Sequence, residues 1–139
     1  MEHLRFLPAV CAVEKEYQIL VPVDADSVMW AEVGGRRFSD ASNGVMRSDT
    51  RLHRIKIPGE VLDRAGEYQI CWQKIIDRKP YFPELEEICR MNFSFRPLPA
   101  DRPLHIYHIA DVHNCDEPAL AAGSFFGEDL DLLILNGDV

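Results

Sequence analysis

Three side chains near the C-terminus are of the types that bind divalent metals. Asp111 and His113 are separated by one residue, and Asp138 follows much later, directly after Gly137. Carboxylate oxygens and an imidazole nitrogen form a mixed ligand set that suits Zn, Fe or Mn. Glycine lets the backbone approach closely just before Asp138. The residue types and their spacing therefore predict a metal site built from Asp111, His113 and Asp138.

Apolar segments precede both halves of this predicted site. Residues 104–110 and 130–135 are typical of buried strands, and residues 119–126 are typical of a short helix between them. This order predicts a βαβ unit with a right-handed crossover. Because ligands bind outside the carboxyl ends of parallel strands, the metal-binding side chains should meet at one edge. Asn114 and Asn136 flank the motifs, and they either orient the ligands or belong to plain loops.

The run Ile109–His113, followed 24 residues later by Gly137–Val139, resembles the opening D-x-H and G-D motifs of calcineurin-like metallophosphoesterases. The resemblance implies that Asp111 and His113 bind a first metal and that Asp138 bridges two metals. It also implies a hydrolase that cleaves phosphate esters by metal-activated hydroxide, with Mn, Fe or Zn as the cofactor. Paired metals lower the pKa of bound water and stabilise the attacking and leaving oxygens.

The family's later motifs, G-N-H-[DE], isolated His residues and G-H-x-H, have no counterpart in this chain. We therefore expect residues 104–139 to be the truncated start of a metallophosphoesterase domain. It should hold metal weakly or not at all, and it should be inactive without the missing parts. So short a segment rarely folds alone, and its unpaired strands favour homo-oligomers. The alternative is a β-sandwich that serves interaction or oligomerisation and carries a vestigial phosphatase segment.

The first hundred residues are patterned as β-strands separated by turn signals. About seven short strands in about 95 residues match the size of a β-sandwich. The clearest predicted strands are Ala9–Glu14, Tyr17–Val23, Val28–Val33, Leu52–Ile57, Glu67–Ile76 and Ile88–Phe95.

The segment Leu62–Tyr68 resembles the tyrosine corner of immunoglobulin-like and fibronectin type III domains. The resemblance implies that Leu62 packs inward and that the Tyr68 hydroxyl bonds to upstream backbone. It also implies that Trp30 is the core tryptophan of the third strand, a structural role that we favour over ligand stacking. We therefore expect a mainly β chain, with an immunoglobulin-like β-sandwich over residues 1–98, a Pro-rich linker over 99–103 and the truncated βαβ unit over 104–139.

Charge is distributed unevenly along the sequence. The formal net charge is −8, yet all 15 Lys and Arg precede residue 104, and seven acids follow it. This acidic balance argues against a general nucleic-acid binder or a binder of anionic membranes. No apolar run approaches the roughly 20 residues that span a bilayer. The four cysteines have no zinc-site spacing, which favours free thiols and a cytoplasmic location.

Overall fold

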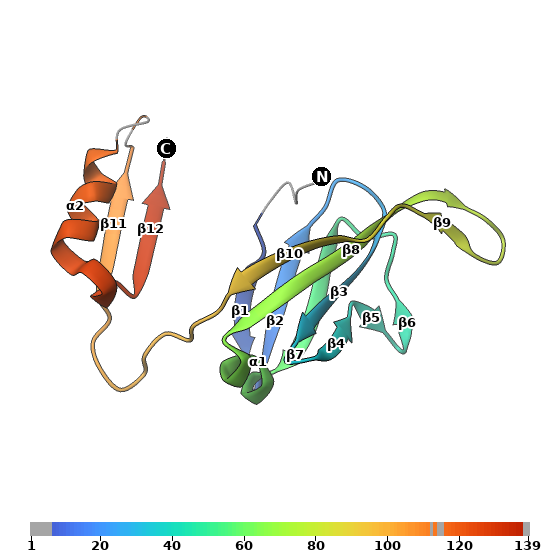
Figure 1. Ribbon diagram of the computed structural model, residues 1–139, viewed down its shortest axis with the longest axis horizontal. Coiled ribbons are helices and arrows are strands. Elements are labelled where there is room, and N and C mark those ends of the chain that lie inside the picture. Colours follow the sequence, from blue (N-terminus) through green and yellow to red (C-terminus); the bar gives the residue numbers. More distant parts are fainter. Residues whose placement is uncertain (1–6, 112, 114–115, 138–139) are drawn as a thin grey trace. The chain divides into compact units, whose positions relative to one another are not determined.

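The computed structural model describes residues 7–111, 113 and 116–137. The chain is mainly β, with 52% of residues in strands against 14% in helices, and its larger sheets are antiparallel. It divides into two compact units, Met1–Arg96 and Pro97–Val139. The boundary falls just before the Pro-rich segment that was predicted as a linker. Figure 1 shows the elements of both units.

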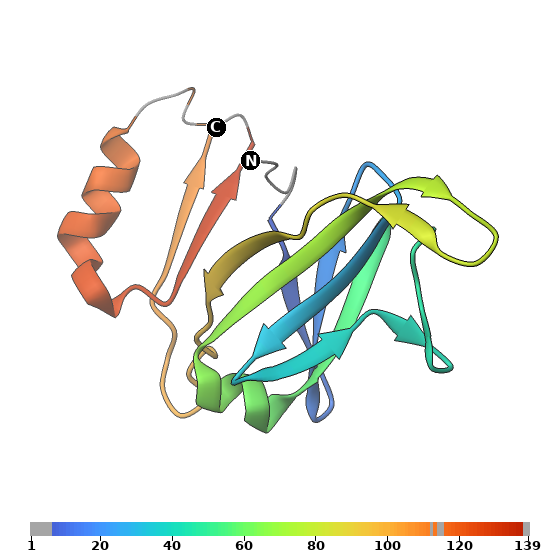
Figure 2. The same cartoon turned by 45° about the vertical axis from the view of Figure 1, so that its right-hand side comes forward.

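The first unit holds two antiparallel sheets that lie one in front of the other in Figures 1 and 2. The smaller sheet has the strand order β1 (Ala9–Val13), β2 (Glu16–Pro22), β7 (Leu52–Pro58). The larger sheet has the order β10 (Cys89–Ser94), β8 (Glu67–Arg78), β3 (Ser27–Val33), β4 (Arg36–Ser39). In addition, β9 (Pro83–Leu85) pairs with the C-terminal end of β8. A small hairpin of β5 (Ala41–Ser42) and β6 (Val45–Met46) follows β4.

Strand alternation builds the core of this unit. Along β7, His53, Ile55 and Ile57 are buried while Arg54 and Lys56 are exposed, because successive side chains point to opposite faces. The core cluster draws on both sheets and on the helix α1 (Gly59–Ala65). Its buried members are Ile19, Val21, Met29, Ala31, Val33, Ile55, Ile57, Leu62, Tyr68, Ile70 and Trp72.

Helix α1 turns the chain from β7 into β8. It ends at Gly66, which adopts a left-handed conformation with φ of 67° and donates its backbone N–H to the Leu62 carbonyl oxygen at 3.0 Å. Leu62 is fully buried, as the sequence predicted. The Gly66 carbonyl in turn accepts a 2.9 Å hydrogen bond from the backbone of Phe95. This short helix therefore fastens the start of β8 to the segment after β10.

One prediction about aromatic side chains needs correction. Tyr68 is buried and stacks on Phe93 with ring centroids 5.2 Å apart, but within the described residues its hydroxyl has no hydrogen-bond partner. Burial raises the pKa of Tyr68 to about 12. Trp30 is buried, as predicted, and Trp72 is a second buried tryptophan, which belongs to the core cluster between the sheets. Trp30 lies on the other face of β3 from Met29, since neighbouring residues of a strand point to opposite sides.

The second unit contains β11 (Ile106–Ala110), α2 (Glu117–Phe126), a short 3₁₀ turn η1 (Gly127–Asp129) and β12 (Leu132–Asn136). The two strands pair in parallel, from Ile106 opposite Leu132 to Ala110 opposite Asn136. Helix α2 begins two residues before the predicted start and has a proline in its first turn, where the missing N–H costs nothing. Among the described residues, no helix has the length and apolar character to cross a bilayer.

Candidate metal centre

Strands β11 and β12 end side by side, at the edge where the metal site was predicted. Ala110 lies opposite Asn136, and the backbone N–H of Asp111 donates to the carbonyl oxygen of Asn136 at 3.0 Å. The chain therefore leaves both strands at the same end of this two-stranded sheet. Asn136, predicted as a residue that orients ligands, contributes this backbone carbonyl.

Gly137 fits closely against Asp111. Its φ is 83°, and a Cβ atom added there would overlap the Oδ1 atom of Asp111 and lie 2.9 Å from its Cγ. The Asp111 carboxylate thus occupies the space that any other residue type at position 137 would need. Only glycine combines this backbone conformation with that open space. The carboxylate is held against the backbone immediately before Asp138.

Asp111 and His113 both adopt left-handed backbone conformations, with φ of 49° and 50°. Residues with a Cβ atom rarely take this conformation, which costs about 1–3 kcal/mol at each position. Strain of this kind gathers at functional sites, where the surrounding structure maintains it. Both residues are exposed, so these side chains are accessible at the end of β11.

The structure accounts for only part of the predicted ligand set. Asp138 and Asn114 lie outside the described residues. Within the described part of the chain, no three His, Cys, Asp or Glu side chains gather closely enough to hold a metal ion. Asp111 and His113 have the donor types for a divalent metal. The Asp111 carboxylate lies against Gly137, the residue that precedes the third predicted ligand, Asp138.

An ion pair at the opposite end of the strand pair aligns the two strands. Arg102 and Asp131 form two parallel hydrogen bonds of 2.8 and 2.9 Å, and the Asp131 side chain is 1% exposed. Asp131 also accepts the backbone N–H of His105 at 2.9 Å, while its own N–H donates to the His105 carbonyl. The Arg102 guanidinium, helped by this backbone bond, holds the pKa of Asp131 well below its usual range. The sequence offers little signal for this pair, because Arg102 lies in the Pro-rich segment and Asp131 lies within the apolar run 130–135.

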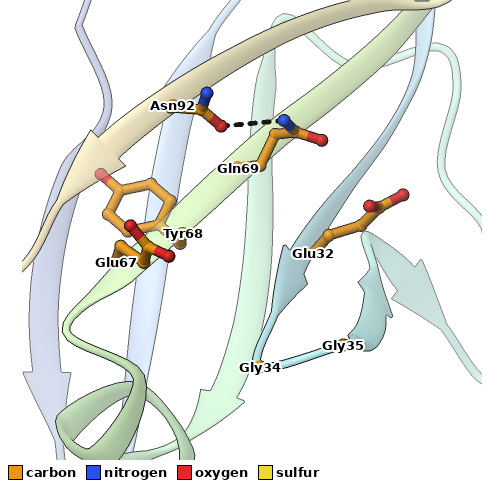
Figure 3. Close-up of a pocket in the computed structure, with 7 residues that line it drawn as sticks. All are labelled: Glu32, Gly34, Gly35, Glu67, Tyr68, Gln69 and Asn92. Carbon is orange, nitrogen blue, oxygen red and sulfur yellow. Dashed lines mark hydrogen bonds between the residues drawn. The ribbon is translucent and has the colours of Figure 1, made fainter.

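A second polar site lies on the larger sheet of the first unit. This pocket of about 410 Å³ is lined by Glu32, Gly34, Gly35, Glu67, Tyr68, Gln69 and Asn92. Figure 3 shows Gln69 and Asn92 facing each other across β8 and β10, and the Gln69 amide donates to Asn92 at 2.8 Å. Glu32 accepts hydrogen bonds from Trp30 and Arg90, which lower the pKa of its carboxyl. Because several of these groups satisfy one another, the pocket indicates no particular reaction.

Comparisons with protein-family models, with curated proteins and with solved structures found no match to this chain. The function of the chain is therefore inferred from its own local geometry. Among the described residues, the end of β11 and β12 is where strained backbone, a carboxylate, an imidazole and a required glycine occur together.

Proposed function

We propose that the chain contains the opening part of a metal-dependent phosphoesterase that resembles the calcineurin-like family. In this proposal the first unit is an immunoglobulin-like β-sandwich, and β11, α2 and β12 form the first βαβ unit of the catalytic domain. The observation that carries the proposal is the fit of the Asp111 carboxylate against Gly137, beside the position that precedes Asp138. A D-x-H motif and a G-D motif at neighbouring ends of parallel strands support it further.

Each residue has a proposed role. Asp111 and His113 provide an oxygen and a nitrogen ligand from one loop, and Asp138 provides the carboxylate shared between two ions. A bound pair of Mn, Fe or Zn ions would lower the pKa of water and neutralise charge on a phosphate ester. The left-handed backbone at Asp111 and His113 sets the directions in which both side chains leave the loop that follows β11.

Titration with Mn²⁺ tests the metal site directly. Paramagnetic broadening of amide resonances should be strongest around residues 111–113 and 136–138 of the wild-type chain. Asp111→Asn and Asp138→Asn should each remove this local broadening, because each takes away a charged ligand. Asp129→Asn is the matched control, since it removes an acid from the same unit but away from the carboxyl ends of β11 and β12. Broadening that is equal in all these variants would contradict the proposal.

Catalysis is tested in a longer chain that also carries the G-N-H-[DE] motif. There Asp138→Asn should abolish metal-dependent hydrolysis of a generic phosphodiester while the stability of the first unit changes little. A wild-type rate in that variant would reject Asp138 as the bridging ligand.

A role in self-association is the second candidate. One feature favours it: β12 exposes a row of large apolar side chains, including Leu133, Ile134 and Leu135. Exposed apolar side chains on a two-stranded sheet with open edges are typical of surfaces that pair with another chain. This role is compatible with the phosphoesterase proposal, and the oligomeric state tests it separately.

A further inference from the structure

A cationic pocket lies in the first unit, remote in sequence from the candidate metal centre. It has a volume of about 330 Å³ and is lined by residues from the β5–β6 hairpin and from β7, two elements labelled in Figure 1. The lining consists of Asp40, Ala41, Ser42, Arg47, Arg54 and Lys56. Three basic residues against one acid give this pocket a net positive charge in a chain whose own net charge is −8.

Two of these cations lack a counter-charge. Arg54 and Lys56 are two residues apart on β7, so their exposed side chains leave the same face of the strand. Within the described residues, neither side chain has an ion-pair or hydrogen-bond partner. The opposite face of the strand is buried in the core, which fixes the direction in which both cations point. Their charge is therefore available to a ligand.

The third cation is held in place by its neighbours. Arg47 donates from Nη2 to the Thr50 hydroxyl at 3.1 Å, and its Nη1 lies 3.7 Å from Oδ1 of Asp40. Its backbone N–H also donates to the Asp40 carbonyl oxygen at 2.8 Å. A guanidinium fixed in this way presents its remaining N–H groups in the planar arrangement that suits oxyanions.

Asp40 offsets the charge of Arg47 and leaves those of Arg54 and Lys56, so the pocket keeps a positive balance. The Asp40 side chain is only 2% exposed, and its Oδ2 lies 2.7 Å from Nδ1 of the fully buried His53. Burying a carboxylate and an imidazole costs desolvation free energy, so a compensating structural role is expected for this pair. The contacts indicate that role: His53 orients Asp40, and Asp40 holds Arg47 at the wall of the pocket.

We propose that this pocket binds the phosphate group of a small phosphorylated ligand. A phosphate monoester carries nearly two negative charges at pH 7 and presents three acceptor oxygens. Arg47, Arg54 and Lys56 supply matching charge and donors, and the Ser42 hydroxyl adds a neutral donor. This site uses no metal and none of Asp111, His113 or Asp138, so it stands or falls independently of the proposed phosphoesterase site.

Titration of the whole chain with inorganic phosphate at constant ionic strength tests this site. The amide resonances of residues 40–42, 47, 54 and 56 should shift and saturate. The double variant Arg54→Gln/Lys56→Gln should weaken binding by about tenfold or more, because two charge-assisted contacts are lost. The control variant Lys15→Gln/Arg64→Gln removes the same charge from exposed positions outside the pocket and should change the affinity by less than about twofold.

Competition provides a second measurement that needs no variant. Sulfate has a similar shape and charge and should displace phosphate from the wild-type chain, whereas chloride at equal ionic strength should not. Three results would overturn the proposal, because each indicates diffuse counterion binding in place of a site. These are shifts that never saturate, an equal loss of affinity in both double variants, and displacement of phosphate by chloride.

Discussion

At position 137 the absence of a side chain leaves room for the Asp111 carboxylate beside the backbone. The Asp111 carboxylate fills the space beside Gly137, and the backbone at both residues is left-handed. The sequence predicts that glycine permits close approach just before Asp138. The structure adds the partner in that approach, which is Asp111 itself.

Gly137→Ala should therefore displace the Asp111 carboxylate and strain the backbone. We expect a loss of about 1–3 kcal/mol in the local stability of the strand pair, measured by amide hydrogen exchange of β11 and β12. Gly123→Ala is the control, because a Cβ there meets nothing within 4 Å and the residue lies in α2. That change should stabilise the helix by about 1 kcal/mol. Equal exchange rates in Gly137→Ala and wild type would contradict the close fit of the Asp111 carboxylate against Gly137.

The buried His53 gives the first unit a pH dependence. Burial lowers the pKa of His53 despite the opposing hydrogen bond to Asp40, and its Nε2 has no partner among the described residues. The unfolded chain therefore binds more protons than the folded one below about pH 6.5. The free energy of unfolding should therefore be highest above that pH and should fall as the pH decreases toward the pKa of His53 in the folded chain. The total loss is about 1.4 kcal/mol for each unit by which the folded-state pKa lies below the unfolded-state pKa.

Two measurements check this expectation. The NMR titration of the His53 ring should give a pKa below 6.5, and denaturant unfolding should show lower stability at pH 5 than at pH 8. A His53 pKa above 6.5 would mean that the attraction of Asp40 outweighs both burial and the repulsion of Arg47.

At the scale of elements, the parallel pair of β11 and β12 depends on the ion pair that precedes both strands. Arg102 and Asp131 join the segments leading into the strands, and the backbone bonds between His105 and Asp131 set the register. That register brings Ala110 opposite Asn136 and thus Asp111 beside Gly137.

Arg102→Ala should loosen this alignment, because it leaves the nearly buried Asp131 carboxylate without its cation. Hydrogen exchange in β11 and β12 should accelerate, and the effect should persist at high salt since the carboxylate is shielded from solvent. Arg102→Lys keeps the charge but loses the two parallel bonds, so it should rescue the exchange rates only in part. Full rescue by Lys would show that charge alone, without the paired geometry, aligns the strands.

The elements also show which features could be predicted from the sequence. Alternation in β7 and in β10 was readable directly, and the apolar runs around residues 104–110 and 130–135 marked β11 and β12. Helix α1 was missed because its seven residues are too few for a helical period to stand out. The burial of Trp30 was predicted, whereas that of Trp72 was not, since a shift of one position in the predicted register exchanges the two faces of a strand.

The sites were predictable to a similarly limited degree. The juxtaposition of Asp111 and Gly137 follows from motifs at the ends of two neighbouring strands, a pattern visible in the sequence. The cationic pocket was not visible there, because it needs the β5–β6 hairpin to bring Ser42 and Arg47 near β7. Two-residue strands leave almost no signal in composition or periodicity.

At the scale of the whole molecule, the two units differ in how well they cover their apolar side chains. The first unit has a core cluster of fully buried residues, whereas Ile109 is the buried apolar residue among those described in the second unit. Leu120 and Phe125 of α2 are 71% and 80% exposed, so the helix leaves large apolar side chains in solvent. Exposure of this kind favours association with another surface.

We expect the chain to self-associate through β12 as its concentration rises. Leu135→Lys should weaken this association, because it places a charge among side chains that would become buried between two copies. Val45→Lys is the matched control: Val45 is 70% exposed in the first unit, and the change in net charge is the same. Sedimentation velocity over a range of concentrations measures the outcome. A wild-type chain that stays monomeric throughout, or equal weakening by both variants, would exclude β12 as the contact surface.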